Sequence, residues 1–200
     1  MPQEVLPLRD RKRQRARDAI IGTALDLFAE HGFAEVSVDD IVKRAEVGRT
    51  TFFRYFGDKQ EVVFADESRL LDELEQQQLS ITTPGPQTLL EALIELESVV
   101  VSLCEGFAAD AKKYRAHEQL LAANPELQAR AAGKLRRLTA TIERGLRERG
   151  TPVRLAVLAP QLACACYITA REIVGDDASE LVPEVHAAFA ELTPAAAISS

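Results

Sequence analysis

Cysteine is scarce in this chain, and its scarcity argues against two kinds of small structural scaffold. The 200 residues include three cysteines, at Cys104, Cys164 and Cys166. An odd, small number without paired spacing does not describe a disulfide framework. Cys164 and Cys166 are two positions apart, so on a helix they point to different faces and are poorly placed to share a metal ion. We expect buried, unreactive thiols, with a redox switch as the alternative.

Long apolar runs are also missing. The longest stretch without a charged residue lies between Arg154 and Arg171, and Pro160 and Gln161 interrupt it. This stretch is too short to span the hydrocarbon core of a bilayer. The N-terminus carries basic residues without an apolar segment behind them, which argues against a secretory signal. We therefore expect a cytoplasmic protein with no membrane partner.

The sequence has no pattern that is typical of a catalytic or metal centre. It lacks a glycine-rich phosphate-binding loop, a nucleophile elbow and a helix with His at positions i and i+4. The three histidines, His31, His117 and His186, fall in three different segments. We expect no catalytic residue, no metal, no cofactor and hence no enzyme. Two alternatives stay open: an enzyme in which the histidines meet in space, and a helical adaptor that binds proteins through its acidic residues.

Positive charge is concentrated at one end of the chain. The net charge is −7, but the first 60 residues carry 11 Lys and Arg against 10 Asp and Glu, whereas the other 140 carry 13 against 21. A basic end on an acidic protein suits an approach to phosphate groups by that end alone. A solvated basic tail without a function is the alternative. The basic residues among the first 17 are Arg9, Arg11, Lys12, Arg13, Arg15 and Arg17.

What the sequence contains throughout is helical periodicity, which predicts an all-α fold. Apolar residues recur at 20, 24, 27 and 28, and Gly32 ends this first helix. Ser37 with Asp40 three positions later predicts the capped start of a second helix. The segment 82–86, Thr-Thr-Pro-Gly-Pro, is the clearest linker. The later helices are predicted at about 49–56, 59–81, 89–107, 111–123, 125–149, 152–174 and 181–192.

The segment from Ser37 to Lys59 carries the chemistry that points to a function. Two short helices joined by a tight turn can present the second helix, here Arg49 to Tyr55, to the major groove of DNA. Arg49 can donate two hydrogen bonds to a guanine edge, and the threonines after it can meet a thymine methyl group or a phosphate. Lys59, at the start of the next helix, can bind a phosphate. A buried three-helix cluster, in which Phe52, Tyr55 and Phe56 are only core aromatics, is the alternative.

The run from Ala45 to Lys59, AEVGRTTFFRYFGDK, resembles the signature of the tetracycline-repressor (TetR) family. The preceding runs ALDLFAEHGF, from Ala24 to Phe33, and SVDDI, from Ser37 to Ile41, are similar to the first and second helices of that family. The three runs occur in the family's order and spacing, and the resemblance covers residues 14–74. The rest of the chain shows only the family's general habit of a variable helical body.

The resemblance implies an N-terminal three-helix helix-turn-helix DNA-binding head over residues 14–74, with its motif at about 37–56. A C-terminal helical domain for ligand binding and dimerisation follows over 75–200. It further implies a repressor that binds a palindromic operator in double-stranded DNA as a homodimer, and that a small-molecule effector of unknown identity releases. The DNA contacts that we expect are Ser37, Arg49, Thr50, Thr51, Phe53, Tyr55 and Lys59.

Two positions depart from the family's pattern. Glu46 stands where the turn usually has glycine, so a residue with a Cβ is expected at positive φ, at a cost of roughly 1 kcal/mol. Phe53 stands where a tyrosine is usual, which keeps an apolar contact for a thymine methyl group but loses a hydroxyl. Neither departure removes the motif, and both affect operator affinity.

The body offers candidates for two further sites. Apolar residues at three- and four-residue steps in the helix after Pro152, and again in the last helix, predict a four-helix interface between two subunits. The alternative is that both stripes fill the core of a single subunit. The predicted interface residues are Leu155, Leu158, Leu162, Cys166, Ile173, Val185 and Phe189. A ligand pocket inside the body is predicted to be lined by Phe64, Phe107, Tyr114, His117 and Tyr167.

Overall fold

The computed structural model describes residues 8–192, except for the side chains of residues 8–12, 66, 67, 75, 78 and 79. Every regular element within these bounds is a helix, which confirms the predicted all-α class. The chain divides into two compact units between Asp66 and Glu67. The predicted boundary at residue 74 therefore lies inside a helix of the second unit and remains a proposal about the domains.

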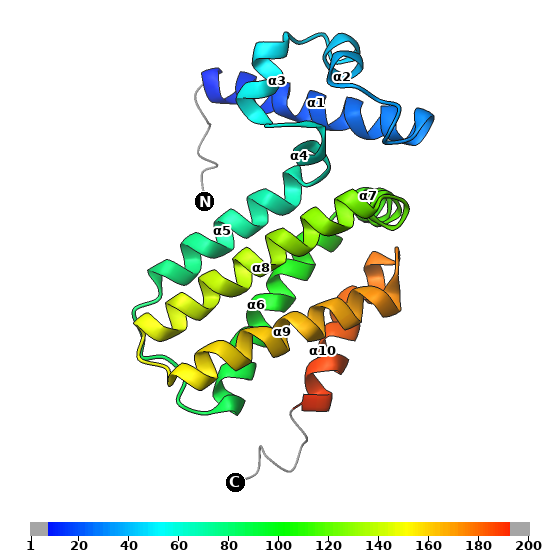
Figure 1. Ribbon diagram of the computed structural model, residues 1–200. Coiled ribbons are helices and arrows are strands. Elements are labelled where there is room, and N and C mark those ends of the chain that lie inside the picture. Colours follow the sequence, from blue (N-terminus) through cyan, green and yellow to red (C-terminus); the bar gives the residue numbers. More distant parts are fainter. Residues whose placement is uncertain (1–7, 193–200) are drawn as a thin grey trace. The chain divides into compact units, whose positions relative to one another are not determined.

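The first unit contains helices α1 (Leu8–His31), α2 (Val38–Arg44), α3 (Arg49–Tyr55) and α4 (Lys59–Val63), shown from blue to cyan in Figure 1. Helix α1 packs against α2 and α4, and α2 packs against α3. All four residues of the apolar stripe predicted for the first helix are buried, because that face of α1 packs into the core of the first unit. Buried side chains of this core include Ile20, Leu27, Phe28, Ile41, Phe52 and Val62.

Helix α2 begins where the sequence predicts, at a reciprocal cap. The backbone N–H of Ser37 donates to Asp40 Oδ2 at 2.9 Å, and the N–H of Asp40 donates to Ser37 Oγ at 3.2 Å. The hydrogen bonds from Ser37 hold the pKa of the Asp40 carboxyl below its usual range. The cap satisfies two N–H groups that have no partner within the helix, so it fixes the entry of α2.

The turn between α2 and α3 has the strained residue that the sequence predicts. Glu46 has a φ of 55°, in the left-handed region that favours glycine. The N–H of Val47 donates to the carbonyl of Val42 at 3.0 Å, which closes the end of α2 in the way that a left-handed residue permits. The turn thus accepts an unfavourable backbone angle in order to redirect the chain into α3.

The prediction of one long helix from Lys59 to about Ile81 is wrong in one respect, because the helix is interrupted at Phe64. Helix α4 ends at Val63, and α5 runs from Ala65 to Ser80. Phe64 has φ −96° and ψ 13°, outside regular helix, and its side chain is fully buried. Helical periodicity cannot reveal such a break, since apolar residues continue on both sides of it.

The second unit is a bundle of α5, α6 (Leu89–Ala108), α7 (Ala111–Ala123), α8 (Pro125–Glu148), α9 (Val153–Val174) and α10 (Leu181–Leu192), with a 3-10 turn at Ala178–Glu180. From α6 onward each helix begins and ends within one residue of the predicted bounds. The reason is that caps mark these ends: Thr88 and Asp110 each accept a hydrogen bond from a first-turn N–H, and Pro125 occupies the first position of α8.

Helix α9 is the central helix of the second unit. It packs against α6, α8 and α10, and Figure 1 shows it running beside α8 in the opposite direction. Its inner face is built from small residues, among them Ala156, Ala159 and Ala163, which are buried and let the neighbouring helices approach closely. By length and composition alone α9 could cross a membrane. Its buried inner face belongs to the core of this unit, so we interpret it as a core helix.

We predict that Glu46→Gly stabilises the protein by about 1 kcal/mol, because glycine adopts positive φ without a steric penalty. The unfolding free energy can be measured with urea. The matched control is Ala45→Gly, one residue earlier, where φ is −80° and the same substitution should be destabilising. A loss of stability in both variants would contradict the assignment of strain to Glu46.

Candidate nucleic-acid interface and ligand cavity

Arg49, the first residue of α3, is held on the surface by two neighbours. Its Nη1 forms an ion pair with Asp39 Oδ1 of α2, and its guanidinium lies 5.7 Å from the centre of the Phe53 ring. The Phe53 side chain is itself unusually exposed for an aromatic, at 48 %. An arginine and an apolar ring therefore stand side by side at the start of α3, and both are accessible to a partner.

The four aromatic residues of α3 and its end divide between two roles. Phe52 and Phe56 are buried, with ring centres 5.6 Å apart, and they attach the helix to the core of the first unit. Phe53 and Tyr55 are not buried, and Arg54 lies over the Tyr55 ring at 5.1 Å. The alternative of a purely structural aromatic cluster thus describes Phe52 and Phe56 but not the outward pair.

The remaining predicted contacts on this surface have mixed environments. Thr50 is exposed, whereas Thr51 is half-buried and its N–H donates to the carbonyl of Gly48 at 2.9 Å. Ser37 serves as the cap of α2. The exposed guanidinium of Arg54 adds a cation beside Tyr55 that is not among the predicted contacts. Its position between Phe53 and Tyr55 is the signal that could identify it.

Lys59 is the predicted contact whose surroundings differ most from expectation. Its Nζ donates to the carbonyls of Phe33, Ala34 and Val36 at 2.8, 3.2 and 2.9 Å. It also lies 4.5 Å from the centre of the Phe33 ring. An ammonium group has three donors, and these carbonyls use all of them. Lys59 thus secures the loop that leads into α2, and a phosphate contact by its side chain would require one of these bonds to be exchanged.

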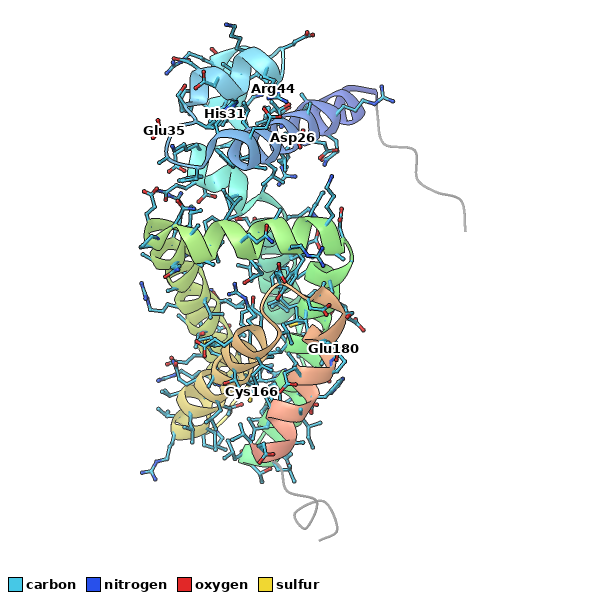
Figure 2. The ribbon with its side chains drawn as sticks, turned by 90° about the vertical axis from the view of Figure 1, so that its right-hand side faces the viewer. Asp26, His31, Glu35, Arg44, Cys166 and Glu180 are labelled. Carbon is cyan, nitrogen blue, oxygen red and sulfur yellow. The ribbon has the colours of Figure 1, made fainter. Side chains whose placement is uncertain are left out.

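The other cations of the first unit are partly engaged within the protein. Arg44 donates to both carboxylate oxygens of Glu30 at 2.5 and 2.7 Å, which lowers the pKa of Glu30. Figure 2 shows Arg44 in the same region as His31 and Asp26, at the end of α1. Arg17 donates to the carbonyl of Ala65 at 2.7 Å. Of the six basic residues predicted to form an arm, Arg13 and Arg15 are exposed, and the side chains of Arg9, Arg11 and Lys12 lie outside the described residues.

The second unit contains a cavity of about 780 Å³ that is bounded by α5, α6, α7, α8 and α9. Two of the five predicted pocket residues line it, Phe107 and Tyr167, whose ring centres are 6.3 Å apart. Most of the wall is apolar, since it also includes Leu71, Leu103, Leu121 and Leu135. The cavity therefore has the size and lining that are typical of small-molecule sites.

Three predicted pocket residues do not line this cavity, which corrects their placement. Phe64 is buried within the first unit. Tyr114 is buried beside the cavity, and its hydroxyl donates to the carbonyl of Gly175 at 3.3 Å. Burial raises the pKa of Tyr114 to about 12, so the phenol stays protonated at neutral pH. His117 is half-buried on α7 and is not part of the wall.

An ion pair closes one end of the cavity. Nη2 of Arg171 on α9 donates to both oxygens of Glu118 on α7, at 2.7 and 2.6 Å. The two side chains are 21 % and 14 % exposed, so water screens the pair only in part. The guanidinium also lies 5.5 Å from the centre of the Tyr167 ring. Sequence periodicity gave no indication of this pair, because its partners are 53 positions apart.

The outer face of α9 carries an apolar stripe. Leu158 and Ile173 are 40 % and 62 % exposed. Leu155 and Leu162 on the same face are half-buried, and Leu162 also packs against the core of its own chain. These four predicted interface residues are accessible to a second molecule. The other three predicted interface residues are buried in the core of their own chain: Cys166, Val185 and Phe189. The prediction that they lie at the interface is therefore wrong, and the alternative, that they fill the core of one subunit, applies to them. The exposed residues of α10 include Pro183, Ala187 and Ala190.

The three cysteines are free thiols, and Cys104 and Cys166 are buried. Burial raises the pKa of all three thiols, that of Cys104 to about 12, so they are protonated and weakly nucleophilic at neutral pH. His186 Nδ1 lies 2.7 Å from Glu97 Oε1 on the surface. Within residues 8–192, no group of three or more His, Cys, Asp or Glu side chains is arranged to hold a metal ion.

Helix α3 is held in place by buried aromatic residues and exposes an arginine at its start. This is the arrangement of the recognition helix in a helix-turn-helix protein. Residues 20–65 match the family model for bacterial regulatory proteins of the tetR family. This match and the sequence motifs together support a transcriptional regulator of the TetR family.

The similarity to individual relatives is partial. Over 123 residues the chain is 30 % identical to MftR of Mycobacterium tuberculosis, which is named as a mycofactocin biosynthesis transcriptional regulator. This match covers 60 % of this chain and 58 % of that protein. Over 63 residues it is 41 % identical to the transcriptional regulator TcmR of Streptomyces glaucescens, or 32 % of this chain and 28 % of that protein. The match thus spans little more than half of one relative and less than a third of the other.

The fold is similar over nearly the whole chain to solved structures of low identity. A complex of SmeT with triclosan has a TM-score of 0.61 at 21 % identity, over 92 % of this chain and 91 % of that one. A transcriptional regulator from Aquifex aeolicus has a TM-score of 0.55 at 19 % identity, over 89 % and 98 %. These likenesses show that the helical body has the same fold as in those proteins.

We predict that Lys59→Met lowers the unfolding free energy by about 1–3 kcal/mol, because three carbonyls lose a charged donor while the apolar stem of the side chain is kept. Urea unfolding measures the loss. Lys43→Met is the control, since Lys43 is exposed on α2, and it should change stability by less than about 0.5 kcal/mol. Equal effects of the two substitutions would show that the three hydrogen bonds contribute nothing.

Proposed function

We propose that the protein is a DNA-binding transcriptional repressor whose contacts with bases come from the start of α3. The observation that carries this proposal is the exposed group of Arg49, Thr50 and Phe53 on a helix whose other side is buried. An arginine fork recognises guanine, and an apolar ring packs against the methyl group of thymine. The DNA-binding domain would cover residues 14–74 and the sensing and dimerising body 75–200.

The ion pair between Arg49 and Asp39 bears on how such a protein meets DNA. Both side chains are more than half exposed, so the pair is screened by water and its net contribution to stability is small. A guanine edge can replace Asp39 as the acceptor at little cost. Until then the carboxylate keeps the guanidinium close to Phe53, in the place where it is needed for contact with a base.

We predict that Arg49→Ala lowers the affinity for the preferred operator by about 1–3 kcal/mol and relaxes the choice of base at one position in each half-site. The operator can be identified by sequencing genomic fragments that the purified protein retains. Affinity is then measured by gel shift on that site and on a scrambled site. Arg44→Ala is the control, since its guanidinium is occupied by Glu30, and it should leave base preference unchanged.

Retention of the parent's selectivity by Arg49→Ala would mean that α3 does not read bases through this residue. Failure of the parent protein to select any fragment would contradict the proposed function as a whole. An enzyme or a protein-binding adaptor would behave in this second way.

We further propose that the protein acts as a homodimer that binds a palindromic operator. The exposed stripe of Leu155, Leu158, Leu162 and Ile173 carries no charge, and such a stripe on a soluble protein favours burial against another surface. The same face on a second copy would supply a symmetric partner. A dimer would place two recognition helices about 34–36 Å apart, the spacing of successive major grooves on one side of DNA.

We predict that Leu158→Glu converts the dimer to a monomer, with a dimer dissociation constant raised at least about 100-fold, because an unpaired carboxylate would be buried at the interface. Sedimentation velocity measures the change. Leu158 is exposed in the single chain, so the variant should still fold. Val153→Glu is the control, at a residue of α9 that is 62 % exposed and lies off the stripe. A Leu158→Glu variant that remains dimeric would place the interface elsewhere.

The cavity of the second unit is the proposed effector site. The related fold of SmeT was solved with triclosan, which supports small-molecule binding by a body of this kind. An effector can weaken DNA binding only to the extent that it prefers a form with a different spacing of the two heads, and about 3 kcal/mol of preference corresponds to roughly 100-fold. We propose a non-enzymatic, cytoplasmic regulator that requires no cofactor for this response.

A further inference from the structure

The cavity is long and narrow, which restricts the shape of its ligand. Its wall on α8 extends from Gln128 to Glu143, and its wall on α9 extends from Gln161 to Glu172. At 1.5 Å per residue, the segment of α8 is about 22 Å long. A volume of about 780 Å³ spread over that length leaves a mean cross-section of roughly 35 Å². An extended chain fits such a space.

The two ends of the cavity differ from its middle. Between them the wall is formed mainly by apolar side chains such as Leu103 and Leu135, with Arg136 next to Leu135. Because α8 and α9 are consecutive and antiparallel, the start of α8 lies at the same end as the last turn of α9. That end holds Arg171 and Glu118. A ligand that fills the cavity therefore presents an apolar body to most of the wall and one terminus to an ion pair.

Of the two partners in that ion pair, Arg171 has the firmer position. Its guanidinium is held by Glu118 and also lies against the Tyr167 ring of its own helix. A carboxylate that replaced Glu118 would find the guanidinium already in place, and arginine binds carboxylates through two parallel hydrogen bonds. A cationic ligand would instead have to displace Arg171 from both Glu118 and Tyr167, which would leave a partly buried guanidinium without its acceptor.

We propose that the cavity binds an elongated monocarboxylate, whose carboxylate takes the place of Glu118 on Arg171 while its apolar chain lies between α8 and α9. The inference deepens the proposed effector function and rests on it. The exchange is one carboxylate for another on the same cation, so it costs little electrostatic energy. The net driving force is burial of the chain, and Glu118 on α7 is released as the ligand enters.

The test uses the full-length protein without DNA and three probes of equal chain length: palmitate, hexadecanol and hexadecyltrimethylammonium, each below its micelle concentration. Binding is measured by displacement of an environment-sensitive fluorophore. We expect palmitate to bind at least about tenfold more tightly than the alcohol and the ammonium. In the series from octanoate to palmitate, each added methylene should strengthen binding, by up to about fourfold, until the cavity is filled.

Two substitutions should act in opposite directions. Arg171→Gln should weaken palmitate at least about tenfold and bring it level with hexadecanol. Glu118→Gln removes the competing carboxylate and should strengthen palmitate binding, a gain that partial unfolding cannot produce. Arg137→Gln, on the exposed side of α8 and outside the wall of this cavity, is the matched control and should change neither.

Four results would overturn the proposal: tighter binding of the ammonium probe, weaker palmitate binding in Glu118→Gln, no dependence on chain length, or loss of headgroup preference in Arg136→Gln, halfway along the α8 wall of the cavity. Release of selected operator fragments is measured separately. Palmitate binding that follows the pattern above but leaves the DNA complex intact would refute effector release and leave the ligand class standing. If another molecule releases the operator, and Arg171→Gln does not change its potency, the proposed ligand class is refuted and effector release stands.

Discussion

The second unit depends on one constraint: a single helix has to satisfy three different surroundings at once. Around the axis of α9, alanines contact the core, Tyr167 and Arg171 line the cavity, and Leu158 and Ile173 are exposed to solvent. A helix of 22 residues turns each face toward the same neighbour every three or four positions, so the three requirements can be met without conflict only by strict periodicity. The small residues matter most, because they let α6 and α10 pack closely enough to fix the direction of the other two faces.

In the first unit the corresponding constraint is electrostatic. Several of its described cations have partners within the unit: Arg44 has Glu30, Arg49 has Asp39, and Lys59 has three carbonyls. Such pairing holds loops and helices in position before any partner arrives. An interface with phosphates then has to be built by exchanging some of these partners. The pairs that are most exposed, such as that of Arg49, are the easiest to exchange.

The sequence was sufficient to predict features that depend on local rules. The cap at Ser37 predicts the start of α2, and the missing turn glycine predicts the positive φ at Glu46. Periodicity also separated apolar from polar faces, but it could not say whether an apolar face meets its own chain or another. Periodicity for this reason predicts an interface position for Phe189, which lies in the core. The Glu118–Arg171 pair joins distant helices, and no local pattern indicates it.

The arrangement of faces on α9 has a consequence for how such a protein can diverge. The residues that meet the cavity and those that meet the exterior alternate along one helix, so they are inherited together and share its axis. A substitution that tilts or shifts α9 to suit a new ligand also moves the stripe that a second copy would have to match. Two duplicated genes that came to sense different molecules would therefore tend to lose the ability to pair with each other. Separation of their signals would follow from the geometry of one helix, without selection for it.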